Sequence, residues 1–234
     1  MSKIVEFKDV VKTYAIGNQT IKANDHVNFE INDGEFCVIV GPSGAGKTTI
    51  LNILGGMDTV TSGSIFIKDK DISLLSLKEL TRYRRYDVGF VFQFYNLMPQ
   101  LTALENVEIA SEICKSALDA RTVLEQVGLK ERIDNFPSQL SGGEQQRVSI
   151  ARAIAKNPKI LLCDEPTGAL DVETGKNILK LLHDTCKVHH KTVILVTHNH
   201  VITEIADRVI HVKNGQIQQT IINEYPKDIE EVVW

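Results

Sequence analysis

The fold is decided by the stretch Gly41-Pro-Ser-Gly-Ala-Gly-Lys-Thr48. It matches the pattern G-x-x-x-x-G-K-[S/T] at every fixed position. The apolar run Phe36–Val40 precedes it, and apolar residues at helical spacing follow it between positions 48 and 57. A buried strand, a glycine-rich turn and a helix in this order predict a loop that binds the phosphates of a nucleoside triphosphate.

The residue types of this loop suit phosphate chemistry. Glycines let the backbone bend so that several N–H groups point at one phosphate, and the following helix turns its positive end toward the anion. Lys47 supplies a mobile charge for the β- and γ-phosphates, and Thr48 offers a hydroxyl to Mg²⁺. We expect the nucleotide to contact Gly41, Pro42, Ser43, Gly44, Ala45, Gly46, Lys47, Thr48 and Thr49.

Two acids follow another apolar run. Asp164 and Glu165 come directly after Ile160–Cys163. Ligands of open α/β sheets bind at the carboxyl ends of the strands, so both acids should lie beside the phosphate loop. We predict that Asp164 holds Mg²⁺ and that Glu165 acts as general base toward the attacking water. The alternative is a strand that ends at an ordinary polar turn.

The chain composition limits the partners. The net charge of −4 argues against a nucleic-acid partner, because proteins that bind nucleic acids usually carry an excess of basic residues. Arg82, Arg84 and Arg85 form a small basic cluster, which we interpret as a solvated helix end and not as a binding patch. No apolar run approaches the ~20 residues that span a bilayer. We therefore expect a cytoplasmic protein that is able to dock on a membrane partner.

The four cysteines are interpreted as buried thiols in a reducing compartment. They are Cys37, Cys114, Cys163 and Cys186, and no two of them have a C-x-x-C spacing.

The order of elements predicts an α/β fold. Strands and helices alternate before residue 94 and after residue 156, which predicts a mostly parallel sheet with an antiparallel β region near the N-terminus. Residues 94–156 are helical in pattern and predict an inserted α-helical subdomain. The whole chain, 1–234, then forms one domain, with 1–93 and 157–234 as its core. Helices are expected over 118–127 and 175–188, and Asn214-Gly215 predicts a hairpin turn.

The segment Leu140-Ser-Gly-Gly-Glu-Gln-Gln-Arg147 narrows the class of nucleotide protein. Ser141 and Glu144 have capping-box spacing, but a cap does not require two glycines, which weaken a helix. The segment resembles the LSGGQ signature of ABC ATPases, with Glu144 in place of the usual glutamine. This resemblance covers nearly the whole chain and implies the P-loop NTPase core of the ABC ATPase fold.

The resemblance also implies roles for single residues. Tyr14 is similar to the aromatic residue that stacks on adenine, and His198 to the histidine that contacts the γ-phosphate. Gln93 is similar to the glutamine that links Mg²⁺ to a membrane subunit, and Asp171 to the acid of the loop at the dimer interface. Ser141, Gly142, Gly143 and Glu144 would contact ATP bound to a second copy of the chain.

The family pattern is a head-to-tail homodimer with two ATP molecules between its subunits. ATP hydrolysis then drives a separate permease, and the ATPase lies on the inner face of the cell membrane. The segments 89–97 and 164–171 resemble the lipoprotein-releasing and macrolide-export branch, which implies a lipophilic or peptide cargo.

Two alternatives remain open. The ATPase could drive a permease-like regulator of cell-wall enzymes without transport, since the partner determines the output. It could also be a soluble ABC ATPase without any transport role, although such proteins usually carry a coiled-coil insert, a zinc module or two ATPase units.

Overall fold

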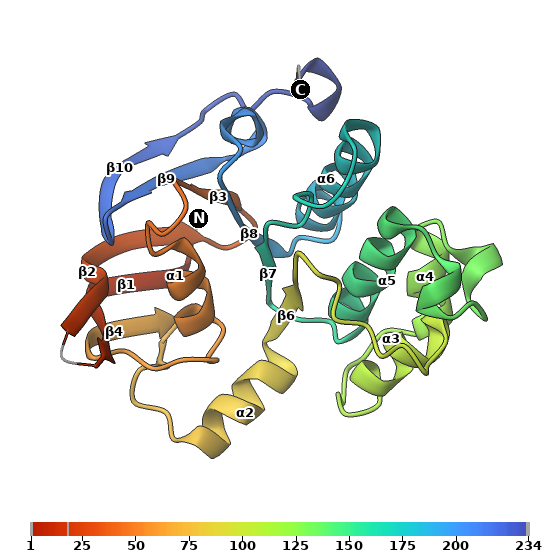
Figure 1. Ribbon diagram of the computed structural model, residues 1–234, viewed down its shortest axis with the longest axis horizontal. Helices are drawn as coiled ribbons and strands as arrows, with labels where there is room; N and C mark the ends of the chain where they lie inside the picture. Colours follow the sequence, from red (N-terminus) through yellow and green to blue (C-terminus); the bar gives the residue numbers. More distant parts are fainter. Residues whose placement is uncertain (1, 18, 233–234) are drawn as a thin grey trace.

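The computed structural model describes residues 2–17 and 19–232 and contains two β-sheets (Figure 1). The larger sheet has six strands in the order β10-β9-β3-β8-β7-β6, and all neighbours are parallel except the pair β9–β10. Its strands are β3 (Phe36–Val40), β6 (Val88–Val91), β7 (Ile160–Asp164), β8 (Thr192–Thr197), β9 (Arg208–Lys213) and β10 (Gln216–Ile222). The hairpin turn predicted at Asn214-Gly215 joins β9 and β10, and both residues have positive φ.

The smaller sheet is antiparallel, with the order β2-β1-β4-β5. Its strands are β1 (Lys3–Ile16), β2 (Gln19–Asn32), β4 (Ser62–Ile67) and β5 (Lys70–Asp71). An apolar cluster lies between this sheet, helix α1 (Lys47–Leu54) and one face of the larger sheet. Because side chains alternate across a strand, Cys37 and Ile39 of β3 join this cluster, while Val38 and Val40 join the cluster on the opposite face.

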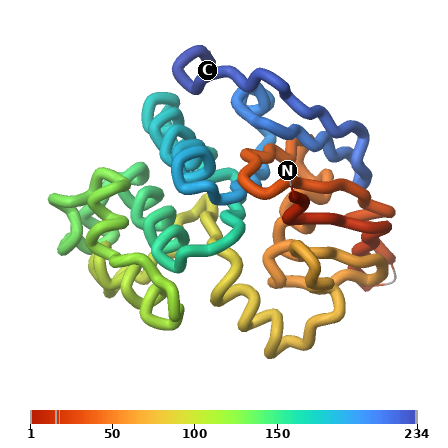
Figure 2. Tube along the Cα trace, turned by 180° about the vertical axis from the view of Figure 1, so that it is seen from behind, coloured from red at the N-terminus to blue at the C-terminus, as the bar shows by residue number. Residues whose placement is uncertain are grey.

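Helices cover the other face of the larger sheet and form a separate lobe (Figure 2). Helix α6 (Val172–Lys187) packs on the sheet, and α2 (Leu77–Tyr86) precedes β6. The lobe contains α3 (Ala103–Ser111), α4 (Ala120–Gln126), η1 (Lys130–Arg132), η2 (Pro137–Gln139) and α5 (Gly142–Ala155), with an apolar cluster of its own. The predicted α/β fold with a mostly parallel sheet, an antiparallel region and a helical insertion is therefore confirmed.

Two helix boundaries differ from the sequence prediction. Helix α6 begins at Val172 and not at 175, because the Asp171 carboxylate accepts a hydrogen bond from the Thr174 N–H and caps the helix three residues earlier. Helix α4 begins at Ala120 and not at 118, because Asp119 caps it in the same way.

One cysteine prediction was wrong. Cys37, Cys163 and Cys186 are buried, whereas Cys114 is half-exposed. It follows the last turn of α3, where its thiol lies 3.1 Å from the carbonyl oxygen of Arg85.

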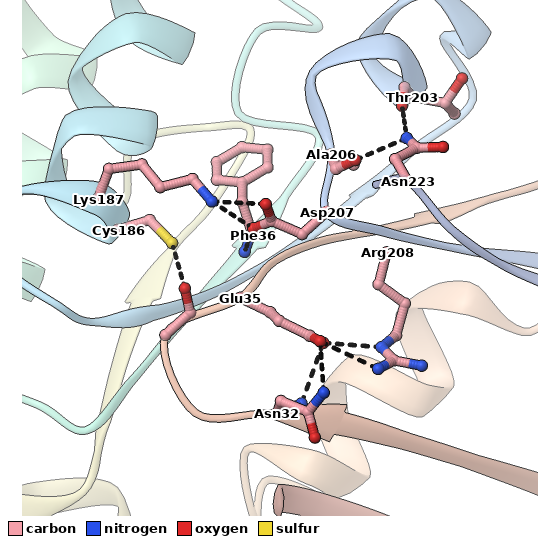
Figure 3. A network of polar contacts seen from close by, with 11 residues as sticks. Asn32, Glu35, Phe36, Cys186, Lys187, Thr203, Ala206, Asp207, Arg208 and Asn223 are labelled. Carbon is pink, nitrogen blue, oxygen red and sulfur yellow. Dashed lines mark hydrogen bonds and ion pairs between the residues drawn. The ribbon is translucent and has the colours of Figure 1, made fainter. Parts of the chain in front are cut away.

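A polar network fixes the start of β3, the strand that leads to the phosphate loop (Figure 3). Arg208 of β9 donates two hydrogen bonds of 2.7 and 3.0 Å to the Glu35 carboxylate, and both side chains are less than a tenth exposed. Asp207 accepts a hydrogen bond from the Phe36 N–H and forms an ion pair with Lys187 of α6. Strand β3 is therefore tied to β9 and to α6 just before it enters the site.

Near the C-terminus, two apolar side chains return to the core. Ile229, the first residue of the short helix η4 (Ile229–Glu231), and Val232, which follows it, are buried in the cluster beneath α6. Of the helices in the described ranges, none combines the length and the apolar character that a membrane crossing requires.

Candidate active site

The phosphate loop lies between β3 and α1, as predicted, and residues of β2 and of the β9–β10 turn contact its backbone. Gly46 has φ 97°, and a side chain there would collide with the Ala23 carbonyl oxygen of β2. The Ala45 carbonyl accepts a hydrogen bond from the Gly215 N–H, and the Gly46 carbonyl accepts one from Nδ2 of Asn24. Within one planar peptide the C=O and the next N–H point in opposite directions. These two contacts therefore aim the Gly46 N–H away from the β9–β10 turn and the Lys47 N–H away from β2.

The Lys47 side chain folds over the loop. Its ammonium donates to the carbonyl oxygens of Gly41 and Pro42, at 2.8 and 3.0 Å. Burial lowers the pKa of Lys47, and the charges of Glu165 and Asp164 oppose that shift. A cation held between carbonyl oxygens and two acids is available to a phosphate that enters the loop.

Asp164 ends β7 directly opposite the start of α1. The Thr48 hydroxyl donates to its carboxylate at 3.3 Å. Burial raises the pKa of Asp164, and the neighbouring Glu165 charge adds to this effect. A carboxylate and a hydroxyl this close are the hard oxygen donors that Mg²⁺ takes beside a triphosphate, so the residues present fit that ion.

Glu165 is held in an unusual backbone conformation. Its φ is 47°, a left-handed value that is strained for a residue with a side chain, and its N–H donates to the Val196 carbonyl of β8. One carboxylate oxygen accepts from the Thr197 hydroxyl at 3.0 Å, and the other lies 2.8 Å from Nδ1 of His198. The two predicted catalytic residues therefore touch each other, which the sequence alone did not show.

Tyr14 lies near the end of β1 and is half-buried. Its hydroxyl donates to the Asp58 carboxylate at 2.6 Å. The ring belongs to the antiparallel sheet, which also backs the phosphate loop through Asn24 of β2.

The signature segment forms the N-terminus of α5. Ser141 is the N-cap, and Glu144 completes the capping box by accepting from the Ser141 N–H at 2.8 Å. Glu144 also pairs with Arg132 of η1. The hydrogen bond from the Ser141 N–H lowers the pKa of Glu144, which favours its charged form. Glu144, which stands where the signature usually has glutamine, is therefore a carboxylate that caps its own helix.

Both signature glycines lie close to residues of other segments of the chain. A side chain at Gly142 would meet the Tyr95 hydroxyl, and one at Gly143 would collide with the methyl group of Thr174 at the start of α6. Asp171, at the exposed N-cap of α6, therefore lies one turn from a residue that packs on the signature. The loop predicted to cross a dimer interface and the signature are neighbours within one chain.

Two glutamines approach the loop that follows Glu165, one predicted as a site residue and one not. Gln93 follows β6, and its Nε2 lies 3.1 Å from the position that a Cβ on Gly168 would take. Gln146 of α5 was not singled out from the sequence. It is fully buried, and its Nε2 donates to the Pro166 carbonyl at 2.8 Å, which ties the signature helix to the catalytic loop.

The signature and the phosphate loop do not meet within one chain. Among the described residues, no hydrogen bond or ion pair joins segment 141–144 to segment 41–49. Figures 1 and 2 show α1 and α5 on opposite sides of the central strands β7 and β8. The phosphate loop and the signature segment therefore lie apart within one chain.

Comparison with known proteins defines the class. The ABC transporter family model matches residues 24–168. An uncharacterized ABC transporter ATP-binding protein of Methanocaldococcus jannaschii is 45% identical over 92% of this chain and 96% of its own length. The macrolide export ATP-binding/permease protein of Vibrio parahaemolyticus is 40% identical over 94% of this chain, which spans 35% of that relative.

A solved structure supports the same assignment. It is a dimeric ATP-binding cassette in a post-hydrolysis state with ADP and Pi, with a TM-score of 0.85 and 44% identity over 93% of this chain and 98% of that one. The chain also spans half the length of two Mycoplasma relatives. The chain belongs to the ABC transporter family and carries its ATP-binding, ATP-hydrolysing cassette.

Proposed function

We propose that this chain is the ATP-binding subunit of an ABC transporter, which hydrolyses ATP in a head-to-tail homodimer and drives a separate membrane permease. The observation that carries the proposal is the separation of the phosphate loop from the signature within one chain. A two-fold pairing lets the phosphate loop of each copy face the signature of the other. The dimeric relative with bound ADP and Pi supports this arrangement.

In this dimer the loop amides and Lys47 bind the β- and γ-phosphates of ATP, while Tyr14 stacks on the base. Thr48, Asp164 and Gln93 would hold Mg²⁺, which would neutralise charge on the phosphate oxygens. Glu165 accepts a proton from the attacking water. His198 contacts the γ-phosphate and, through its 2.8 Å contact, orients the Glu165 carboxylate.

The signature completes the site in trans. Ser141, Gly142 and Gly143 direct the N–H groups and the positive end of α5 at the γ-phosphate held by the partner copy. Glu144 lies beside these groups, and Asp171 lies at the interface between the two copies. Residues 94–156 act as a subdomain that moves with the signature, and 1–93 with 157–234 form the core that holds the phosphate loop.

A basic groove supports docking of a permease, and it includes Arg82 and Arg85, which the sequence alone indicated as a solvated helix end. The groove has a volume of about 980 Å³ and lies between α2 and the helical lobe, away from the phosphate loop. Its charged lining is dominated by seven cations, Lys70, Lys78, Arg82, Arg85, Lys115, Lys156 and Lys159, against the two acids Glu79 and Asp87. An acidic cytoplasmic segment of the permease fits this charge, and it would hold the chain on the inner face of the cell membrane. The relative named for macrolide export supports a lipophilic or peptide cargo.

Replacement of the general base tests the hydrolytic part. Glu165→Gln keeps the shape of the side chain and removes the proton acceptor, so ATP should bind but turn over at least ~10²-fold more slowly. ATP should then convert this variant to a dimer in gel filtration, whereas wild-type protein should return to monomer after hydrolysis. Undiminished turnover in Glu165→Gln would remove the role proposed for this residue.

Charge reversal tests the docking part. Arg82→Glu in the groove should reduce co-purification with the permease encoded by the neighbouring reading frame, while the ATPase rate of the isolated chain stays unchanged. Lys180→Glu on α6, an exposed lysine outside the groove, is the matched control. Equal co-purification of both variants would contradict docking at the groove.

A further inference from the structure

Tyr14 is held by a set of polar contacts that the proposed mechanism does not use. Its hydroxyl donates to Oδ2 of Asp58 at 2.6 Å. Asp58 lies in the connection between α1 and β4, 44 residues from Tyr14 in the sequence. The aromatic ring is therefore tied to the connection that follows the helix of the phosphate loop.

A buried lysine supports the same carboxylate. Lys12 is 8% exposed, and its ammonium donates to Oδ1 of Asp58 at 2.6 Å and to the Thr59 carbonyl at 2.7 Å. The Thr59 N–H donates to the same carboxylate oxygen at 2.7 Å. Asp58 thus receives hydrogen bonds on both oxygens, one from the tyrosine and two from the lysine and the backbone.

The lysine also contacts the ring. Its ammonium lies 4.8 Å from the centroid of the Tyr14 ring, within the range of a cation–π contact. Burial raises the pKa of Tyr14, and the Asp58 hydrogen bond adds to the shift, so the phenol stays protonated and remains a donor. Burial also raises the pKa of Asp58, but the hydrogen bonds from Lys12 and Tyr14 outweigh it, so the carboxylate stays charged.

These contacts set the ring before a nucleotide arrives. A half-exposed tyrosine without them would sample several rotamers, and a base that stacks on it would bear the entropy of ordering the side chain. Anchoring the hydroxyl on Asp58 removes that freedom and fixes where the ring lies.

We propose that Asp58 is a positioning residue for nucleotide binding, which with Lys12 holds the Tyr14 ring as a preformed surface for the planar base. This inference rests on the proposed function, in which Tyr14 stacks on the base of ATP. It adds two residues, Asp58 and Lys12, that do not touch the nucleotide and act through the ring.

The test compares two probes, ATP and inorganic tripolyphosphate, which lacks a base. Asp58→Asn should raise the Kd of ATP about three- to tenfold, the range expected when one side chain must be ordered on binding, and should leave the Kd of tripolyphosphate unchanged. In hydrolysis assays KM should rise with kcat unchanged. Asp71→Asn is the matched control, because Asp71 is a hydrogen-bonded acid of the sheet that carries Tyr14, and its partner is Ser73.

Variants of Tyr14 separate the possible outcomes. Tyr14→Ala should weaken ATP but not tripolyphosphate, and adding Asp58→Asn to it should have no further effect. A lack of effect of Tyr14→Ala on ATP would remove the stacking role in the proposed function itself. If Tyr14→Ala weakens ATP and Asp58→Asn does not, or if Asp58→Asn weakens both probes equally, the positioning role is wrong.

A milder variant covers the case in which Asp58→Asn fails to fold. Tyr14→Phe removes only the hydroxyl and leaves the pair of Asp58 with Lys12 intact. It should raise the Kd of ATP by a similar factor, and an affinity equal to that of the wild type would overturn the inference.

Discussion

The buried ion pair at the start of β3 allows a quantitative prediction. Arg208→Met removes the guanidinium that donates two hydrogen bonds to Glu35, and leaves a carboxylate whose side chain is 8% exposed. Two hydrogen bonds from Asn32, at 3.0 and 2.6 Å, remain, but they carry no charge. Breaking a buried pair by removing one partner destabilises by about 3–5 kcal/mol, and we expect a loss in this range.

The neighbouring ion pair is the matched control. Lys187 pairs with Asp207, the residue before Arg208, but the Lys187 side chain is 39% exposed and solvent screens the pair. Lys187→Met should therefore cost less than about 1 kcal/mol. Urea unfolding followed by circular dichroism measures both free energies. The double variant Glu35→Met/Arg208→Met should recover part of the loss, because no unpaired charge stays buried. Equal losses in Arg208→Met and Lys187→Met would refute the reasoning from burial.

Three further predictions follow from the site and the same network. Burial raises the pKa of Glu35, but hydrogen bonds from Arg208 and Asn32 lower it below its ordinary value of 4.5, so its contribution to stability is present above about pH 4.5 and is lost as the pH falls through the lowered pKa. The unfolding free energies of wild type and Glu35→Gln should therefore differ above about pH 4.5 and converge as the pH falls below it. Lys47→Ala removes a charge-assisted contact and should raise the Kd of ATP about ten- to a hundredfold in a fluorescent-nucleotide titration, with an unchanged Kd arguing against the phosphate role. In Gly143→Ala the new methyl group collides with that of Thr174, and the ATPase rate should fall about tenfold. The double variant Gly143→Ala/Thr174→Ser lacks the Thr174 methyl group and should recover activity. A double variant as slow as Gly143→Ala would contradict the collision as the cause.

The parts of the site that are local in sequence could be predicted. The phosphate loop is a continuous segment whose strand and helix are visible in the apolar pattern, and Asp164 and Glu165 mark the end of a strand that must lie beside it. The hairpin at Asn214-Gly215 follows from turn chemistry within two residues.

Contacts between distant segments could not be predicted, because they depend on how the two sheets pack. Glu35 and Arg208 are 173 residues apart and meet only because β3 and β9 are neighbours. Asn24 approaches the Gly46 carbonyl from the antiparallel sheet, and nothing in the sequence around it indicates that partner. Gln146 resembled one more polar residue of an amphipathic helix, yet it is fully buried against the loop after Glu165.

In the proposed function, the roles of the signature residues also depend on a second copy of the chain. Ser141 and Glu144 were predicted as a capping box, and that box is present. The glycines beside it pack on Tyr95 and Thr174 of their own chain, and their N–H groups lie in the first turn, where a helix offers no acceptor of its own.

Mixing two inactive variants tests most directly the central claim that each site is shared between two chains. Lys47→Ala disables the phosphate loop, and Ser141→Arg disables the signature. In a head-to-tail heterodimer one site receives both defects and the other receives none. Random pairing of equal amounts gives about half heterodimers, so the mixture should recover up to about a quarter of the wild-type ATPase rate. A mixture no more active than the two variants measured separately would contradict a shared site.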